Sequence, residues 1–354
     1  MTNIVKADIA KIAATPLNWQ KLQGKTVLVT GATGFIGSFI IHSLMKKWED
    51  DGLDVKILAL VRNADRARAA YGDYEAKGRL DFLVQDVCSP LPTDKKADFI
   101  IHCASNAAPK EYSLYPVETM KTNFYGTLNL LDYAKAVDAE SFLYVSTIEV
   151  YGTTHGVDRI DEDTYGEIDA MKVRSCYPLS KKGCETLSIS YADEYGLNVK
   201  IGRLSYIFGP GMKAGDSKIV AVFPKCIADG ENIVMKSKGE QLRSYTYVTD
   251  AITGLLTVLL DGESGNAYNI ASKLCITTIA GIAHTLVESY PEKGLKVIFD
   301  LPTEAEAKGF SLIENAVLSS EKLEALGWAP ETDLVTGLKN VVEEQLELKL
   351  YLVI

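Results

Sequence analysis

The sequence predicts an α/β fold in which a doubly wound parallel sheet carries helices on both faces and a smaller mixed lobe follows. Continuous apolar runs at 26–30, 55–61 and 99–102 are typical of strands buried on both faces of such a sheet. Helical patterns separate the strands, and the alternation continues to a sixth strand at 199–204. From about residue 207 the elements become shorter, and this change predicts the second lobe.

The first strand, at 26–30, runs directly into a glycine-rich loop and then into an apolar helix that reaches about Trp48. The first glycine of the loop permits a tight turn, the second admits a pyrophosphate, and the third lets the helix pack on the strand. The helix N-terminus adds free N–H groups and positive potential. Strand, turn and helix in this order predict a Rossmann-type dinucleotide site. Its contacts are predicted at Gly31, Thr33, Gly34, Phe35, Ile36 and Gly37.

The second strand, at 55–61, ends in Arg62 and Asn63, where an acidic residue would hold the adenosine ribose of NAD. Arg62, together with Arg66, can pair instead with the 2′-phosphate of NADP. NADP is therefore the favoured cofactor, and NAD is possible. The alternative is that Arg62 is a surface arginine that stacks on adenine.

The ends of the next two strands supply further cofactor contacts. The strand at about 80–84 is followed by Asp86 and Val87, and Asp86 can accept from the adenine amino group or else cap a turn. Asn123, on a later helix, is a further candidate. The fourth strand is followed by small residues that can line the nicotinamide ribose, namely Cys103, Ala104 and Ser105.

Thr147 and Glu149 lie just after the fifth strand, predicted at 141–145. Chemistry is expected here, because the ligand crevice of a parallel sheet lies outside the carboxyl ends of its strands. Two residues apart on an extended segment, the two side chains can share one side.

Tyr177 and Lys181 are four residues apart on a predicted helix and therefore lie on one face of it, one turn apart. Pro178 suits the first turn of this helix. A phenol titrates near 10 when free, and a nearby ammonium favours the phenolate, so the pair can make a base. The alternative is an ordinary solvated helix face.

Composition restricts the class of protein. The 354 residues are 47% hydrophobic and 24% charged, which is usual for a globular protein, and they suffice for two lobes. A net charge of −10 argues against nucleic acid or an anionic membrane as partner. No signal peptide or bilayer-spanning run is visible, which predicts a cytoplasmic protein. Six cysteines without a CxxC pair and four histidines without ligand spacing predict free thiols and no metal site.

The glycine loop, Ser146-Thr147 and the Tyr177/Lys181 pair, in this order, resemble the extended short-chain dehydrogenase/reductase family. The branch is that of NAD(P)-dependent nucleotide-sugar epimerases, dehydratases and decarboxylases, and the resemblance covers nearly the whole chain. Local matches to UDP-glucuronate decarboxylases lie in the segments 116–128, 146–152 and 174–177.

The resemblance implies a role for each candidate catalytic residue. Tyr177 takes the proton of the sugar 4-hydroxyl while C4 gives a hydride to the nicotinamide. Lys181 lowers the pKa of Tyr177 and holds the nicotinamide ribose, and Thr147 hydrogen-bonds the same sugar oxygen. A carboxylate at the position of Glu149 works on C5 protons in decarboxylases and some 4,6-dehydratases, and a 4-ketone makes C5–H acidic enough for this. The alternative is that Glu149 only orients a loop.

The second lobe is expected to bind the nucleotide-diphosphate sugar. The dinucleotide domain is predicted at 1–205 plus about 244–270, and the nucleotide-sugar lobe at about 206–243 plus 271–354. Arg243 is expected to meet the diphosphate, unless it forms an ion pair between the lobes. Arg174 is a second candidate for substrate binding.

Three departures from the family patterns bear on the reaction. Ile148 replaces the aspartate of dTDP-glucose dehydratases, and Tyr206 replaces the asparagine of the decarboxylases. The segment 310–315 lacks the arginine that meets a sugar carboxylate in decarboxylases, which makes a carboxylated sugar doubtful.

The leading hypothesis is an enzyme that oxidises C4 of a nucleotide-linked hexose with a tightly held NAD(P) and then acts at C5, as decarboxylases and 4,6-dehydratases do. The alternatives are a 4-epimerase, in which Glu149 is structural, a net reductase that consumes NADPH, and a non-catalytic dinucleotide-binding protein. A homodimer through the helices at about 117–136 and 178–195 is the family expectation.

Overall fold

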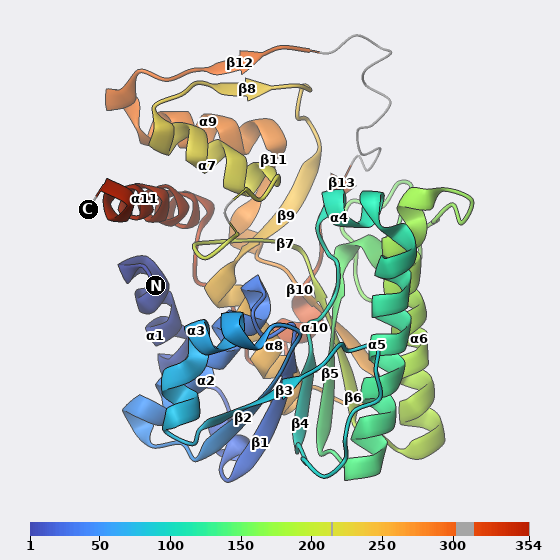
Figure 1. The fold of residues 1–354 in the computed structure, drawn as a ribbon. Coiled ribbons are helices and arrows are strands. Elements are labelled where there is room, and N and C mark those ends of the chain that lie inside the picture. Colours follow the sequence, from blue (N-terminus) through green and yellow to red (C-terminus); the bar gives the residue numbers. More distant parts are fainter. Residues whose placement is uncertain (214, 302–314, 354) are drawn as a thin grey trace.

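A computed structural model describes residues 1–213, 215–301 and 315–353. Its main feature is a seven-stranded sheet in which all neighbouring strands are parallel, beside a smaller region built on short sheets (Figure 1). This arrangement confirms the predicted doubly wound α/β fold. In sheet order the strands are β10 (Asn266–Ile270), β6 (Val199–Leu204), β5 (Ser141–Thr147), β4 (Phe99–His102), β1 (Lys25–Thr30), β2 (Val55–Val61) and β3 (Leu80–Val84).

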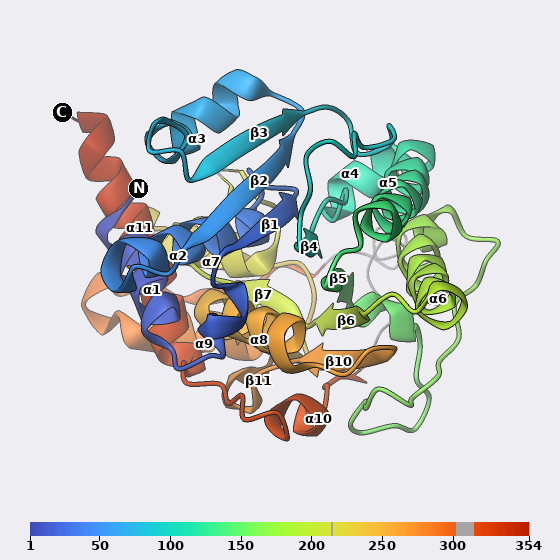
Figure 2. The ribbon, with the colours of Figure 1, turned by 90° about the horizontal axis from the view of Figure 1, so that it is seen from below.

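Helices cover both faces of the large sheet, and each face has its own core (Figure 2). Successive residues of a strand point to opposite faces. Val27 and Val29 of β1 accordingly pack in one core, and Leu28 packs in the other. The first core includes residues of α2 (Phe35–Asp51), α3 (Ala64–Ala76) and α8 (Val248–Asp261), and the second includes residues of α5 (Pro116–Val137) and α6 (Cys176–Tyr195).

The smaller region is mixed, as predicted. Its central strand β9 pairs in parallel with β7 and β13 and antiparallel with β11, and β8 pairs with β12 separately. The strands are β7 (Tyr206–Phe208), β8 (Ile233–Met235), β9 (Leu242–Tyr247), β11 (Ile276–Thr278), β12 (Val297–Phe299) and β13 (Asn315–Ala316). The helices of this region are α7 (Ile219–Asp229), α9 (Ile279–Ser289) and α11 (Leu334–Val353), whereas the short α10 (Glu321–Glu324) lies against β10 and α8 of the large sheet.

The chain returns to the large sheet after β9, because α8 packs on it and β10 forms its edge. β9 itself belongs to the small sheet, although its residues 244–247 overlap the segment 244–270 that is predicted for the first domain. The two domain boundaries otherwise remain a prediction.

The N-terminal helix α1 (Asn3–Ala14) begins after Thr2, whose side chain accepts from the Val5 N–H and caps it. It ends before Thr15-Pro16, because the residue before a proline is disfavoured in the α-helical region. The Tyr247 hydroxyl donates to the buried Asp8 at 2.6 Å, so this lead-in is tied to the start of α8.

Candidate active site

The glycine loop joins β1 to α2 at the carboxyl edge of the large sheet, and each glycine is needed for its shape. Gly31 has φ +64°, and a Cβ there would lie 3.0 Å from the backbone N of Ala104. A Cβ on Gly37 would lie 2.5 Å from the carbonyl oxygen of Gly31. The loop therefore has a left-handed turn at its start and a helix pressed on it at its end, as the dinucleotide motif requires.

The loop and the start of α2 fit the diphosphate of a dinucleotide. α2 begins at Phe35 with Gly34 as its N-cap, so the first-turn N–H groups, including those of Ile36 and Gly37, have no partner within the helix. A guanidinium nitrogen of Arg66 donates to the carbonyl of Thr33 at 3.3 Å, which supports the loop from the neighbouring α3. These residues could hold the cofactor, but the predicted contacts remain a prediction.

At the end of β2 the chain presents Arg62, which is exposed and has no ion pair among the residues described. Asn63 caps α3 by accepting from the Arg66 N–H at 2.8 Å. Asp86 accepts from the Cys88 N–H at 2.8 Å, so one carboxylate oxygen makes the turn cap that was the alternative to adenine binding. Val87 next to it is buried.

A chain of hydrogen bonds links the predicted nicotinamide region to α6. Cys103 and Ala104 follow β4, and the Ser105 hydroxyl donates to the Asn123 side chain at 2.8 Å. The Asn123 amide then donates to the Ser180 hydroxyl at 2.8 Å. Asn123 is 1% exposed, so this network fixes the first turns of α6 from the side of α5.

Tyr177 and Lys181 both lie in the first turns of α6, which begins at Cys176, and Pro178 is in its first turn as predicted. Tyr177 is 6% exposed and Lys181 is 3% exposed, so they do not form an ordinary solvated helix face. The Lys181 ammonium donates to the Val145 carbonyl at 2.6 Å and lies 4.1 Å from the centre of the Tyr144 ring. The structure thus directs this lysine toward the end of β5.

Burial is the largest influence on the pKa values of both members of the pair. Burial raises the pKa of Tyr177 above its ordinary value and the charge of Glu149 raises it further, while a hydrogen bond with Thr147 opposes them. Burial also lowers the pKa of Lys181 to about 8. Burial is thus the largest influence on the pKa of Tyr177, and the expectation that Lys181 lowers this pKa stays a prediction.

Thr147 and Glu149 come together with Tyr177, but not on an extended segment as predicted. Thr147 is the last residue of β5, and Ile148–Tyr151 form a 3₁₀ turn. The Glu149 N–H donates to the Thr147 hydroxyl at 3.4 Å, a local cap that closes the turn. The turn ends at Gly152, which has φ +66° and whose N–H donates to the Glu149 carbonyl at 3.1 Å, so this glycine was the signal in the sequence that could have predicted it.

Glu149 and Arg174 form a bidentate ion pair. The two terminal guanidinium nitrogens of Arg174 lie 2.9 Å and 3.0 Å from the two carboxylate oxygens of Glu149. The Glu149 side chain is 17% exposed and that of Arg174 is 50% exposed, so the pair lies at the rim of the site. Arg174 therefore binds the predicted catalytic carboxylate, and its role as a substrate ligand remains a prediction.

Tyr112 is a site residue that the sequence did not reveal. It lies on the short helix α4 (Pro109–Leu114), and its ring stacks on that of Tyr177 with centroids 5.1 Å apart and planes at 19°. The Arg174 guanidinium carbon lies 4.5 Å from the centre of the same Tyr112 ring. No residue pattern marks a tyrosine in such a short helix, so only the Tyr-rich segment before Pro116 could have drawn attention to it.

Arg243 lies on β9 with its guanidinium 4.7 Å from the centre of the Tyr206 ring. Its Nε is buried and has no hydrogen-bond partner among the residues described, and no ion pair between lobes is seen there. The guanidinium is thus available to an anion such as a diphosphate. Most of the segment 310–315, where a decarboxylase arginine was sought, lies outside the described residues.

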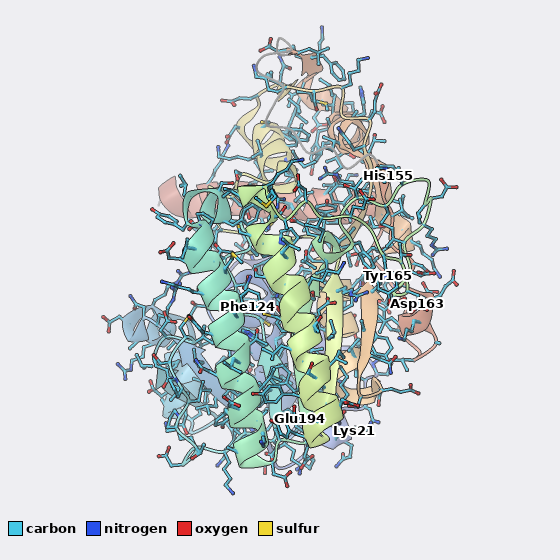
Figure 3. The ribbon with its side chains drawn as sticks, turned by 90° about the vertical axis from the view of Figure 1, so that its right-hand side faces the viewer. Lys21, Phe124, His155, Asp163, Tyr165 and Glu194 are labelled. Atoms are coloured by element: carbon cyan, nitrogen blue, oxygen red, sulfur yellow. The ribbon has the colours of Figure 1, made fainter. Side chains whose placement is uncertain are left out.

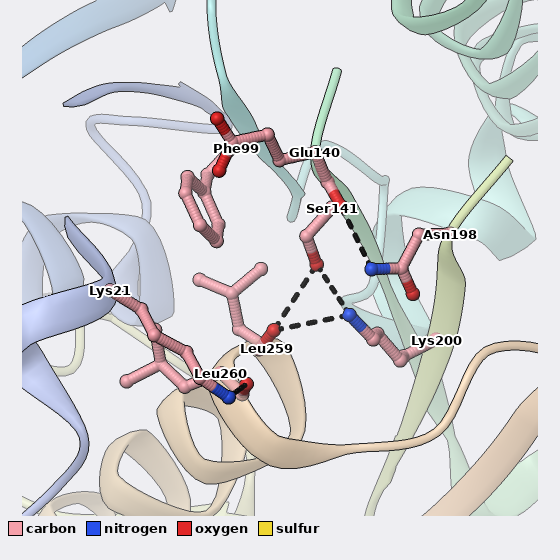
Figure 4. A pocket seen from close by; sticks show the side chains of 8 residues that line it. All are labelled: Lys21, Phe99, Glu140, Ser141, Asn198, Lys200, Leu259 and Leu260. Carbon is pink, nitrogen blue, oxygen red and sulfur yellow. Dashed lines mark hydrogen bonds between the residues drawn. The ribbon is translucent and has the colours of Figure 1, made fainter. Parts of the chain in front are cut away.

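A cavity of about 340 Å³ lies elsewhere, by the N-terminal ends of β5 and β6 (Figure 4). The ammonium of Lys200 donates there to the Ser141 hydroxyl at 2.8 Å and to the Leu259 carbonyl at 3.4 Å, and Lys21 donates to the Leu260 carbonyl at 2.6 Å. Both lysines satisfy the last carbonyls of α8, a structural role that the negative end of a helix favours. This cavity lies at the amino ends of the strands, whereas the glycine loop lies at their carboxyl ends.

The fold and the site define a short-chain dehydrogenase/reductase-type protein with a glycine loop and a buried Tyr/Lys pair. The family model described as "NAD dependent epimerase/dehydratase family" matches residues 27–271, and the chain belongs to this family.

Relatives of known activity are similar over most of their length. UDP-glucuronic acid decarboxylase 6 of Arabidopsis thaliana is 33% identical over 325 residues, 92% of this chain and 89% of the relative. UDP-glucuronic acid decarboxylase 1 of Xenopus tropicalis is 30% identical over 320 residues, 90% of this chain and 71% of the relative.

Solved structures agree with the fold. A dTDP-glucose 4,6-dehydratase of Streptomyces venezuelae with NAD and TYD bound has a TM-score of 0.76 at 25% identity, over 92% of this chain and 98% of that one. A UDP-glucose 4-epimerase of Thermotoga maritima has a TM-score of 0.75 at 22% identity, over 92% of this chain and 99% of that one, and shows the fold alone.

The described residues contain no helix that is long and apolar enough to cross a membrane. The cytoplasmic location stays a prediction. No cluster of three metal-ligating side chains is found among the same described residues. All six cysteines are free thiols.

Proposed function

We propose that this protein modifies a nucleotide-diphosphate sugar by oxidising its C4 and then acting at C5, in the manner of a decarboxylase or 4,6-dehydratase. The observation that carries the proposal is the position of Glu149 near the buried Tyr177: its carboxylate pairs with Arg174, whose guanidinium lies 4.5 Å from the centre of the Tyr112 ring that stacks on Tyr177. The identity to UDP-glucuronic acid decarboxylases supports this class of reaction.

In this proposal each side chain has one task. When bound, the nicotinamide supplies the hydride acceptor for C4. Tyr177 takes the proton of the sugar 4-hydroxyl, and the nearby Thr147 hydroxyl holds the same oxygen. Glu149 removes or steers the C5 proton, which the adjacent 4-ketone has made acidic.

The substrate is expected to enter between the large sheet and the smaller region. The free guanidinium of Arg243 provides the positive charge for its diphosphate. A sugar carboxylate would have to compete with Glu149 for Arg174, because both terminal nitrogens of Arg174 are engaged. This competition favours a sugar without a carboxylate, and a uronic acid would bind Arg174 only after the Glu149–Arg174 ion pair separates.

The test is incubation with UDP-, GDP-, CDP- and dTDP-hexoses, including uronic acids, in deuterated water. We expect solvent deuterium at C5 of the product, read by mass spectrometry and proton NMR. Turnover with no deuterium at C5 for any substrate would refute action at C5 and leave a 4-epimerase.

A 4-epimerase is the second candidate, and one observation favours it. The bidentate pair with Arg174 gives Glu149 a structural role at the site even without chemistry. A 4-epimerase of this family rotates the 4-keto sugar and needs no base at C5.

NADP remains the favoured cofactor for this chain. The family is NAD-dependent by description, and the Streptomyces structure was solved with NAD. In this chain, however, the residue that follows β2 is the exposed Arg62 rather than an acid. An exposed guanidinium at the end of this strand suits a 2′-phosphate.

A homodimer through α5 and α6 remains the expected assembly. The two helices lie side by side on one face of the molecule (Figure 3). Val117, Phe124, Tyr125 and Leu128 are exposed apolar residues of α5 on the outside of the sheet. Such a stripe suits burial against a second copy.

A further inference from the structure

The Tyr112 ring contacts both Tyr177 and Arg174. Tyr112 is 1% exposed and stacks on Tyr177, with centroids 5.1 Å apart. The same ring lies 4.5 Å from the guanidinium carbon of Arg174, which holds Glu149 by two hydrogen bonds. Tyr112 thus links the residue assigned to C4 with the residue assigned to C5.

The ring itself is held firmly. Tyr112, Cys176 and Tyr177 form a small buried cluster apart from the two large cores. The Cys176 thiol lies 3.6 Å from the Tyr112 carbonyl oxygen, and the Tyr112 N–H donates to the Ala108 carbonyl at 3.2 Å. The position of α4 is therefore tied to the first turn of α6.

Arg174 needs such a support. Its side chain is half exposed, and a long exposed side chain loses rotamer freedom when it is held in one geometry. A flat aromatic face attracts a guanidinium and restricts its plane. Without that face, Arg174 is free to move, and the carboxylate that it holds moves with it.

We propose that Tyr112 is a positioning residue that keeps the Glu149–Arg174 pair in register with Tyr177, so that the C5 step follows the C4 step in one sugar pose. This inference rests on the proposed function. In the first step the 4-hydroxyl proton would pass to the Tyr177 phenolate, and a cofactor held by the glycine loop would accept the C4 hydride. In the second step of a dehydratase the C5 proton would pass to the Glu149 carboxylate and the electrons of C5–H would enter the 4-ketone as an enolate. In a decarboxylase the electrons of the C5–C6 bond would enter the ketone as CO2 leaves, and Glu149 would steer the proton that then adds to C5.

The experiment compares Tyr112→Leu with Tyr112→Phe in a single turnover in deuterated water. Absorbance of the reduced nicotinamide reports the C4 step, and deuterium at C5 reports the second step. For Tyr112→Leu, we expect the ratio of C5 uptake to C4 oxidation to fall about tenfold, as loss of a partly desolvated cation–π contact implies. Tyr112→Phe keeps the ring and should keep the ratio.

Two further variants make the result decisive. Leu114→Ala, at an exposed residue of the same helix, should leave both steps unchanged. Arg174→Lys keeps the charge and the packing of α4 but removes the planar group, and it should lower the ratio as Tyr112→Leu does. If a thermal melt shows that Tyr112→Leu is unfolded, Arg174→Lys still tests the proposal.

The outcomes separate the two proposals. If the wild type takes up C5 deuterium and the ratio stays unchanged in both Tyr112→Leu and Arg174→Lys, the positioning role is refuted while the proposed function stands. If the wild type takes up no deuterium at C5 from any sugar that it oxidises, the proposed function fails first, and this inference fails with it.

Discussion

The carboxylate of Glu149 and the guanidinium of Arg174 form a two-point ion pair, with N···O distances of 2.9 and 3.0 Å. Arg174 precedes α6, which carries Tyr177 and Lys181, and Glu149 lies in the turn after β5. The pair therefore links two elements that present the proposed chemistry.

Replacing Glu149 by Gln should lower turnover by about 10²–10⁴-fold, the usual contribution of a general acid or base. C4 oxidation and substrate binding should persist, because the amide keeps the size of the side chain. Steady-state kinetics and the absorbance of reduced nicotinamide measure these effects. Glu167→Gln, at a side chain 86% exposed, is the matched control. Turnover equal to that of the wild type would favour the 4-epimerase instead.

Replacing Arg62 by Ala should weaken NADP binding about tenfold or more and leave NAD binding nearly unchanged, since one charge-assisted contact to the 2′-phosphate is lost. Dissociation constants for the two cofactors, measured by fluorescence titration, test this. Arg68→Ala is the control, because Arg68 is exposed and pairs with Glu75 on α3. Equal loss for both cofactors would contradict the assignment of Arg62 to the phosphate.

Because Lys181 is buried, the free energy of unfolding should change with pH in the alkaline range. Its pKa falls from 10.5 to about 8 through burial, so between these values the unfolded chain binds more protons than the folded one. The contribution of Lys181 to stability is therefore largest above pH 10.5, where the amine is neutral in both states. It is lost as the pH falls from 10.5 through about 8, because the buried amine must then become charged. Relative to Lys181→Met, the wild type should therefore gain up to about 3 kcal/mol as pH rises across this window. Guanidinium unfolding of both proteins without cofactor measures the difference, and a constant difference would contradict the burial effect.

The ion pair between Glu185 and Arg203 should be structurally important, because it is buried. Their side chains are 7% and 14% exposed, and the closest N···O distance is 2.8 Å. Glu185→Ala leaves a buried guanidinium without its carboxylate and should cost about 3–5 kcal/mol of unfolding free energy. Glu75→Ala, which breaks an exposed pair on α3, should cost less than about 0.5 kcal/mol. Similar losses for the two variants would refute the distinction.

Much of the fold was predictable because its signals are local. The strands at 55–61 and 199–204 have the predicted bounds, since runs of apolar residues are needed wherever both faces of a strand are buried. The glycine loop was predictable for a similar reason: Gly31 needs a positive φ, and Gly37 must admit a backbone oxygen at close range.

Side-chain partners were less predictable. Helical spacing placed Tyr177 and Lys181 on one face, but it could not show that burial would raise the pKa of the first and lower that of the second. The same limit applies to Glu149: Gly152 after it marks a turn, but the sequence does not show that Arg174 is the partner of the carboxylate.

By itself, the sequence determined the parallel sheet, the dinucleotide loop and the choice of Tyr177, Lys181 and Glu149 as candidates, because each depends on residues adjacent in the chain. Only the tertiary structure decided that Arg174 binds Glu149 and that Tyr112 stacks on Tyr177. Those contacts join side chains from separate helices and turns, and they form only where the packing of α4, α6 and the end of β5 brings their surfaces together. Hydrophobic periodicity records which face of an element is buried, but it does not record which residue of another element lies against that face.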